Sequence, residues 1–279
     1  MMLAAAGCWS QIECGGNYCC AVRRGDGSVA CWGLSRFGGA TPPPGLTGVQ
    51  MVASWIATCA VLSPGGTVTC WGDNTFGQLA VPSGLAGVTY IDASMHNTMC
   101  AVQGSGMVTC WGYNGDYGNA IPPPRLPPAK AVALGGEFSC ALSVAGTVTC
   151  WGYNYGDPVS PSNDLTNVTA ISAGEYHACA LKADTTVVCW GNNGLGQLDV
   201  PAGLTGVDAI GAGPYGTCAL TGSGSVVCWG QAAQPDLAPG QQVDQLNTNA
   251  NGITTCVALL GSTIKCSGRF GNGNPPPTC

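Results

Sequence analysis

The sequence predicts an all-β, seven-bladed β-propeller with one intra-blade disulfide per repeat, spanning residues 1–279 as a single domain. Three observations predict this fold: a repeat of about 39 residues, a pair of cysteines in each repeat, and a composition rich in Gly and poor in charge. Repeats of about 40 residues that hold several short strands are typical of propeller blades.

The composition favours short strands joined by tight turns. The 279 residues include 44 Gly, 46% are hydrophobic and only 8% are charged. This apolar content is sufficient for a core, and Gly supplies the turns. The net charge of -6 argues against nucleic-acid binding, because affinity for phosphate comes mainly from Lys and Arg. No apolar run reaches 18 residues, so we expect no membrane span.

The repeat is marked by the motif Cys-Trp-Gly, which becomes Cys-Ser-Gly in the last copy. Successive copies are 38 to 40 residues apart. Alternating apolar residues, interrupted by Gly, Asp, Ser or Pro, predict three to four short strands per repeat, two of them in a hairpin. The repeats end near Cys31, Cys70, Cys110, Cys150, Cys189, Cys228 and Cys266.

A second cysteine precedes each of these by ten or eleven residues, on the neighbouring strand of the predicted hairpin. Directly opposed residues of an antiparallel pair lie about 4.5 Å apart in Cα terms, which suits a disulfide. We therefore predict the disulfides Cys20–Cys31, Cys59–Cys70, Cys100–Cys110, Cys140–Cys150, Cys179–Cys189, Cys218–Cys228 and Cys256–Cys266.

Four cysteines near the chain ends remain: Cys8, Cys14, Cys19 and Cys279. We favour Cys8–Cys279 and Cys14–Cys19, with an intermolecular disulfide as the alternative. A chain with this many disulfides is expected to be secreted, extracellular or at the cell surface. Residues 1–7 are too short for a signal peptide, so we expect that a leader was removed or that the start is truncated.

Residues 177–213 carry a family resemblance. Their run HACAL…VVCWGNNGLGQLDVPAGLTGVDAIGAG resembles the repeat of the regulator-of-chromosome-condensation family, especially its secreted, Cys-paired members such as the Crinkly-type plant receptor ectodomains. The segment GQL–VP–GL is also similar to the secreted β-lactamase-inhibitor protein II. The resemblance implies a seven-bladed propeller, but it does not fix the function, because one fold hosts many functions.

Two departures from this family limit what is carried over. The nuclear founder is a guanine-nucleotide exchange factor bound to chromatin; this chain has no basic tail, so we do not expect that role. In the seventh repeat, Ser267 replaces Trp and GNGNPPP replaces GQL–VP. We expect this blade to be looser, or completed by the N-terminal segment.

One variable loop per repeat, directly after an Ala-Gly-like dipeptide and on one face of the ring, supplies the candidate binding residues. Large apolar and aromatic groups there are typical interface anchors. Partial burial between blades is an equally weighted alternative. The candidates are Trp55, Ile56, Met95, His96, Glu137, Tyr176 and Tyr215.

The remaining Trp, His, Asn and Pro residues that stand out in the sequence are expected to have structural roles or to be sites of modification. The Trp of the repeated motif is expected to pack in the core or between blades. His96 and His177 fall in different repeats without the spacing of a catalytic set, so we expect no enzyme activity, cofactor or metal site. Asn167 begins a glycosylation sequon. Resemblance to wall glycoproteins suggests hydroxylation and O-glycosylation in the Pro-rich stretches, with Pro43, Pro123 and Pro276 as candidate sites.

The first functional hypothesis is a secreted, non-catalytic module that binds a protein or a glycan through one loop-lined face. The alternative is a structural subunit that binds itself and assembles into an extracellular filament or coat, because contacts between opposite faces give open fibres. A further alternative, by resemblance alone, is an inhibitor of a secreted enzyme.

Overall fold

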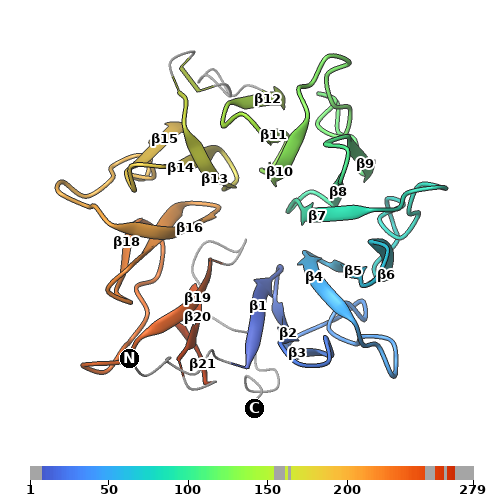
Figure 1. Ribbon diagram of the computed structural model, residues 1–279, viewed down its shortest axis with the longest axis horizontal. Helices are drawn as coiled ribbons and strands as arrows, with labels where there is room; N and C mark the ends of the chain where they lie inside the picture. The colour runs from blue at the N-terminus through green and yellow to red at the C-terminus, as the bar shows by residue number, and fades with distance from the viewer. Residues whose placement is uncertain (1–7, 154–160, 163–164, 249–254, 261–262, 268–279) are drawn as a thin grey trace.

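The computed structural model describes residues 8–153, 161–162, 165–248, 255–260 and 263–267. These residues form seven antiparallel sheets of three strands each, arranged as blades around a central channel (Figure 1). We number the blades 1 to 7 in chain order. The predicted all-β, seven-bladed propeller is confirmed.

Each blade runs outward from the channel in chain order, from an inner strand to a middle and an outer strand. The inner strands are β1 (Trp9–Cys14), β4 (Val49–Ser54), β7 (Val88–Ala93), β10 (Ala129–Leu134), β13 (Val168–Ala173), β16 (Val207–Gly213) and β19 (Val243–Thr248). The middle strands are β2 (Tyr18–Arg23), β5 (Ala57–Leu62), β8 (Thr98–Gln103), β11 (Phe138–Ser143), β14 (His177–Lys182), β17 (Gly216–Thr221) and β20 (Thr255–Leu259). The outer strands are β3 (Val29–Gly33), β6 (Thr67–Gly72), β9 (Val108–Gly112), β12 (Val148–Gly152), β15 (Val187–Gly191), β18 (Val226–Gly230) and β21 (Ile264–Ser267).

The segment that links one blade to the next forms turns in the described residues, and a fourth strand is not present there. Between blades 2 and 3, Ala80 N–H donates to the Gly77 carbonyl at 3.0 Å, and Leu85 N–H donates to the Pro82 carbonyl at 3.1 Å. Successive turns of this kind leave no room for an extended ladder. Of the predicted three to four strands per blade, three is therefore correct.

The ring closes by packing blade 1 against blade 7. Blade 7 consists of β19, β20 and β21 only, so the described part of the chain does not bear out completion of this blade by the N-terminal segment. Trp9 is fully buried in a cluster that also contains Cys256, Ala258 and Ile264 of blade 7. Within the described residues no helix is long and apolar enough to cross a membrane.

The repeated tryptophans are buried between blades, as predicted. Their exposed fractions range from 3% at Trp32 to 9% at Trp151. Among the described residues, four of these indoles donate Nε1–H to a carbonyl in the linker that comes from the preceding blade, at 2.7 to 2.9 Å; the bonds are Trp71 to Gly39, Trp111 to Gln78, Trp151 to Asn119 and Trp229 to Gln197. Each such bond fixes a blade to its neighbour.

All seven predicted hairpin disulfides are formed, each joining a middle strand to an outer strand. Their Cα atoms are 4.0 to 4.1 Å apart, because the two cysteines are directly opposed in register. Cys14 also pairs with Cys19 across β1 and β2. Cys8 is disulfide-bonded, but Cys279 lies outside the described residues, so Cys8–Cys279 stays a prediction.

Candidate functional site

One face of the ring is built from two sets of loops. Inner and outer strands of a blade run in the same direction, so the loops that follow them emerge on the same side. In blades 1 to 6 the loop after the outer strand is hydrogen-bonded to the loop between the inner and middle strands, for example Tyr113 N–H to the Asn97 carbonyl at 3.0 Å and Asn192 N–H to the Tyr176 carbonyl at 2.9 Å. We call this side the loop face.

The structure places all seven predicted binding residues on the loop face, and all are half-buried. Several contact the loop of the neighbouring blade. The Trp55 carbonyl accepts a hydrogen bond from Gly16 N–H at 3.1 Å, and His96 Nδ1 lies 3.8 Å from Glu137 Oε1. A hydrogen bond to Glu175, together with its charge, raises the pKa of Tyr215. These loops therefore join adjacent blades while part of their surface stays exposed. Partial burial between blades is thus observed, and the binding role of these residues stays a prediction.

A second set of loop-face residues, which the sequence analysis missed, is more exposed. We call it the apolar row: one large apolar side chain per blade, in the loop after the outer strand of blades 1, 2, 3 and 5. Its members are Phe37, Phe76, Tyr117 and Leu195, with exposed fractions of 58%, 47%, 48% and 43%. Four such side chains at equivalent positions are a property of the repeat, and isolated surface apolar residues do not explain them.

The loop conformation explains why these side chains are exposed. Each precedes a Gly with a positive φ, such as Gly77 at 82° and Gly196 at 80°, which other residues rarely adopt. The next residue is then buried under the loop. The fully buried Gln78 accepts a hydrogen bond from Phe76 N–H at 2.8 Å, and Gln197 does the same for Leu195 at 2.8 Å. The buried amide holds the loop, and the apolar side chain faces solvent.

Aromatic contacts extend the apolar row across three blades. The rings of Phe76 and Tyr113 pack edge to face with centroids 5.1 Å apart, and Tyr117 and Tyr153 lie 3.9 Å apart. Phe37 also lines a groove of about 50 Å³ together with Trp55 and Ile56. The apolar row and the predicted loop residues thus form one surface over blades 1 to 4.

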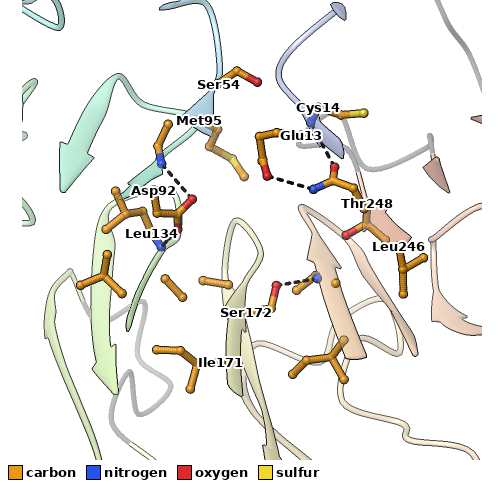
Figure 2. A pocket seen from close by; sticks show the side chains of 18 of the residues that line it. Glu13, Cys14, Ser54, Asp92, Met95, Leu134, Ile171, Ser172, Leu246 and Thr248 are labelled. Carbon is orange, nitrogen blue, oxygen red and sulfur yellow. Dashed lines mark hydrogen bonds between the residues drawn. The ribbon is translucent and has the colours of Figure 1, made fainter. Parts of the chain in front are cut away.

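A cavity of about 180 Å³ occupies the central channel on the loop-face side (Figure 2). Residues at the ends of the inner strands line it, among them Glu13, Ser54, Asp92, Met95 and Thr248. Of the predicted binding residues, Met95 alone is among those that line the cavity. The sequence analysis did not single out the others.

The lining belongs to a layer of seven residues, one from each inner strand, that lie opposite the first cysteine of each hairpin disulfide. We call it the clamp layer: Glu13, Ala53, Asp92, Ala133, Ser172, Gly211 and Asn247. Polar residues alternate with Ala or Gly. Because seven is odd, alternation fails once, and two polar residues meet where blade 7 joins blade 1.

The polar members of the clamp layer join adjacent blades. Asp92 Oδ2 accepts the Leu134 N–H at 2.9 Å, and Ser172 Oγ accepts the Ala212 N–H at 2.8 Å. At the meeting of the chain ends, Asn247 Oδ1 accepts the Cys14 N–H at 3.2 Å. Each bond reaches to the next blade. The clamp-layer residue of that blade is small at the first two junctions, whereas at the third it is Glu13. Between blades 1 and 2 the same role belongs to Gln11, which bonds both the N–H and the carbonyl of Val52 at 2.8 and 2.9 Å.

Glu13 is thus left without a role in joining blade 1 to blade 2. Among the described residues, its carboxylate accepts a hydrogen bond only from Asn247 Nδ2, at 3.2 Å. Burial, followed by the charge of Asp92, raises the pKa of Glu13 well above its usual value. Burial also raises the pKa of Asp92 to about 7, although two backbone N–H bonds oppose the shift. Both side chains are surrounded by protein while part of their surface faces the cavity.

The described residues show no set of side chains arranged for catalysis. His177 is fully buried, its Nε2 lies 2.8 Å from Thr217 Oγ1, and burial lowers its pKa to about 4. The one described cluster of three potential metal ligands is Cys14, Cys19 and Cys256, and all three are in disulfides. It therefore offers no thiolate ligand.

The candidate modification sites differ in accessibility. Asn167 is exposed, with φ of 58°, at a position where other blades have a Gly of positive φ such as Gly87. Pro43 is exposed and Pro123 is half-buried. Pro276 lies outside the described residues. Modification of these residues stays a prediction.

Comparison with known proteins supports the repeat assignment. Residues 129–156, 168–197 and 207–232 match the model of the regulator of chromosome condensation (RCC1) repeat. A search of curated protein sequences finds no match. The matched segments fall in blades 4, 5 and 6.

Solved structures with the same architecture include two plant receptor ectodomains. The ectodomain of the Physcomitrella patens receptor kinase CR4 is 25% identical, with a TM-score of 0.75 over 92% of this chain and 72% of that one. The Crinkly ectodomain of the Arabidopsis thaliana receptor kinase ACR4 is 26% identical, with a TM-score of 0.74 over 95% of this chain and 96% of that one.

Yeast RCC1 (Prp20), in its complex with Kap60, is 17% identical, with a TM-score of 0.63 over 79% of this chain and 70% of that one, and shows the fold alone. The chain therefore carries repeats of the regulator-of-chromosome-condensation type, on a disulfide-rich, seven-bladed propeller similar to the Crinkly receptor ectodomains.

Proposed function

We propose that this chain is a secreted, non-catalytic interaction module that binds a protein partner through its loop face. The observation that carries the proposal is the apolar row, because exposed aromatic side chains repeated over adjacent blades match the anchors of protein interfaces. The disulfides fit an oxidising compartment, and the similar receptor ectodomains are extracellular parts of receptors.

The chemistry of the loop face suggests a partner surface that is apolar at its centre and basic at its edge. Phe37, Phe76 and Tyr117 supply the apolar anchors, while the half-buried carboxylates Glu137 and Glu175 lie nearer the channel. The net charge of -6 would attract a basic partner. The propeller would act as a rigid base on which the variable loops select the partner.

The test compares two sets of surface substitutions. The combined variant Phe37→Ala, Phe76→Ala, Tyr117→Ala removes three anchors. The matched control Met107→Ala, Val144→Ala removes side chains that are 56% and 63% exposed in hairpin turns on the opposite face. Immobilised oxidised chains would be exposed to a defined set of extracellular proteins and to a glycan array.

We expect the wild type and the control to retain the same protein, and the triple variant to bind it at least about tenfold more weakly, since interface anchors contribute roughly 2 kcal/mol or more each. Equal retention by all three chains would refute the loop-face proposal. Retention of a glycan in place of a protein would favour the glycan-binding alternative.

Self-assembly is a second candidate, favoured by the presence of exposed apolar groups on both faces. Phe37 and Phe76 lie on the loop face, and Met107 and Val144 lie on the opposite face. A contact between unlike faces is heterologous and can propagate. Light scattering that rises with concentration, and falls in both variant chains, would support assembly; a monomer at all concentrations would exclude it.

A further inference from the structure

The cavity in the channel holds a carboxylate that the architecture does not require. At the clamp layer, Gln11 joins blade 1 to blade 2 and Asn247 joins blade 7 to blade 1. Glu13 lies between these two junctions and faces the cavity. Its burial among protein groups, with a single hydrogen bond from Asn247 in the described residues, costs stability.

Two hydroxyl groups of residues that line the cavity are also unsatisfied. Ser54 in blade 2 and Thr248 in blade 7 are 3% and 8% exposed, and in the described part of the chain neither hydroxyl has a hydrogen-bond partner. Both residues line the cavity, and they come from the two blades that flank blade 1 (Figure 2). Buried hydroxyls are normally hydrogen-bonded, so this pair indicates a ligand.

We infer that the cavity binds a primary alkylammonium group, with the ammonium paired with the Glu13 carboxylate. The ligand is a cation because the lining contains the carboxyl groups of Glu13 and Asp92 and no Lys, Arg or His. An ammonium has three N–H donors and no acceptor, which suits a lining whose carboxylate at Glu13 and unsatisfied hydroxyls at Ser54 and Thr248 can all accept hydrogen bonds.

The opposite wall of the cavity suits an alkyl chain. Leu134, Ile171, Ile210 and Leu246 line it from blades 4 to 7. The volume of about 180 Å³ has room for several non-hydrogen atoms. A calcium ion would need six to eight oxygen ligands, whereas both oxygens of Asp92 already accept backbone N–H bonds, from Ala93 and Leu134. The geometry therefore favours an organic cation over a metal ion.

Such a group could come from a free amine or from a lysine side chain of a protein. The inference rests on the channel and does not depend on the proposed function of the apolar row. Binding would be measured by isothermal titration calorimetry on the full oxidised chain at pH 8, with n-butylammonium as the probe. The neutral 1-pentanol, calcium chloride and the peptide acetyl-Gly-Lys-Gly-amide would be titrated in parallel.

We expect n-butylammonium to bind and 1-pentanol to bind at least about tenfold more weakly, because only the cation pairs with Glu13. Binding of the peptide as tightly as the free amine would identify a lysine side chain as the source. Binding of the free amine alone would identify a small molecule. Tighter binding of calcium than of the amine, or no binding of n-butylammonium, would overturn the inference.

The substitution Glu13→Gln keeps the size of the side chain and an acceptor for Asn247, and should weaken amine binding at least about tenfold. The double variant Ser54→Ala, Thr248→Val leaves the carboxylate in place and should weaken it by a smaller factor. Asp184→Asn is the matched control, since it removes one negative charge from an exposed turn. Unchanged affinity in both cavity variants would refute the site.

The pH dependence gives an independent readout. Glu13, Tyr90 and Asp92 are the titratable groups of the lining, and burial raises the pKa of each. The amine stays protonated up to about pH 10, whereas the carboxyls must ionise to hold it. Affinity should therefore rise from pH 5 to pH 8, and a flat profile would contradict binding at Glu13.

Discussion

The buried titratable residues have opposite effects on stability as the pH changes. His177 is held neutral by burial, so protonating it costs more in the folded protein than in the unfolded chain. Asp92 is held protonated by the same cause, so ionising it costs more when folded. Falling pH therefore destabilises the fold through His177, while rising pH destabilises it through Asp92.

The substitution His177→Phe tests the first effect. Phe occupies the equivalent register position in blade 4, at Phe138, so the pocket accepts an aromatic ring. Burial lowers the pKa of His177 to about 4 from the ordinary histidine value of 6.5, so the wild type should lose roughly 3 kcal/mol relative to the variant as the pH falls from 6.5 to 4. Denaturant unfolding of both oxidised chains at several pH values measures the difference, and parallel curves would show that His177 does not titrate as described.

At the scale of the element, each hairpin was predictable because its signals are local. Cys179 and Cys189 are ten residues apart around a turn, and antiparallel pairing brings them opposite each other. The linker was harder, because its Gly and Pro fit either a short edge strand or successive turns. The buried Gln78 stabilises the turns. Its side chain accepts a hydrogen bond from Phe76 N–H and donates one to the Asp73 carboxylate, and its backbone carbonyl accepts one from the Trp111 indole N–H.

The substitution Gln78→Ala tests this role of the buried amide. It removes the acceptor for Phe76 N–H and one donor to the Asp73 carboxylate, and so leaves the Phe76 N–H without its partner and Asp73 with its bonds from Thr75. We expect a loss of about 1–3 kcal/mol in the free energy of unfolding. Hydrogen exchange should become faster at the Phe76 amide and stay unchanged at Leu195, where Gln197 provides the internal control. Equal exchange at both amides would show that the loop holds its conformation without Gln78.

In the whole molecule, closure of the ring brings together residues whose proximity could not be predicted from the sequence. The seven copies of the repeat predicted seven blades, and the repeated Trp predicted an apolar residue buried in each. The clamp layer brings together residues about 40 positions apart, and Cys14 and Asn247 are 233 residues apart. An acidic residue at Glu13 or Asp92 has no local signature, because its neighbours are supplied by other blades. The apolar row did have a local signature: an apolar residue followed by Gly and then by Gly, Gln or Asn, after four of the six Cys-Trp-Gly motifs, those at Cys31, Cys70, Cys110 and Cys189.

In a ring of seven blades, polar and small residues of the clamp layer cannot alternate at every junction, so one junction must be irregular. Here that junction lies between blades 7 and 1, where the chain ends meet. At an internal junction such as that between Ser172 and Ala212, the linker also holds the two blades together. Between blades 7 and 1, closure depends on Asn247, on the exposed Arg24–Asp244 ion pair at 3.2 Å and on side-chain packing. Asn247 there bonds both Cys14 N–H and Glu13, so its loss leaves two groups unpaired.

The substitutions Asn247→Ala and Ser172→Ala compare these junctions directly. We expect Ser172→Ala to cost about 1 kcal/mol and Asn247→Ala to cost about twice as much or more, because a buried N–H and a buried carboxylate both lose their partner. Hydrogen exchange should accelerate at Cys14 and along β1 and β19 in the Asn247 variant, but only locally at Ala212 in the Ser172 variant. Both variants could instead lose the same stability and show faster hydrogen exchange only at the amide next to the substituted residue. The junction between blades 7 and 1 would then be no weaker than any other, and closure of the ring would not depend on Asn247.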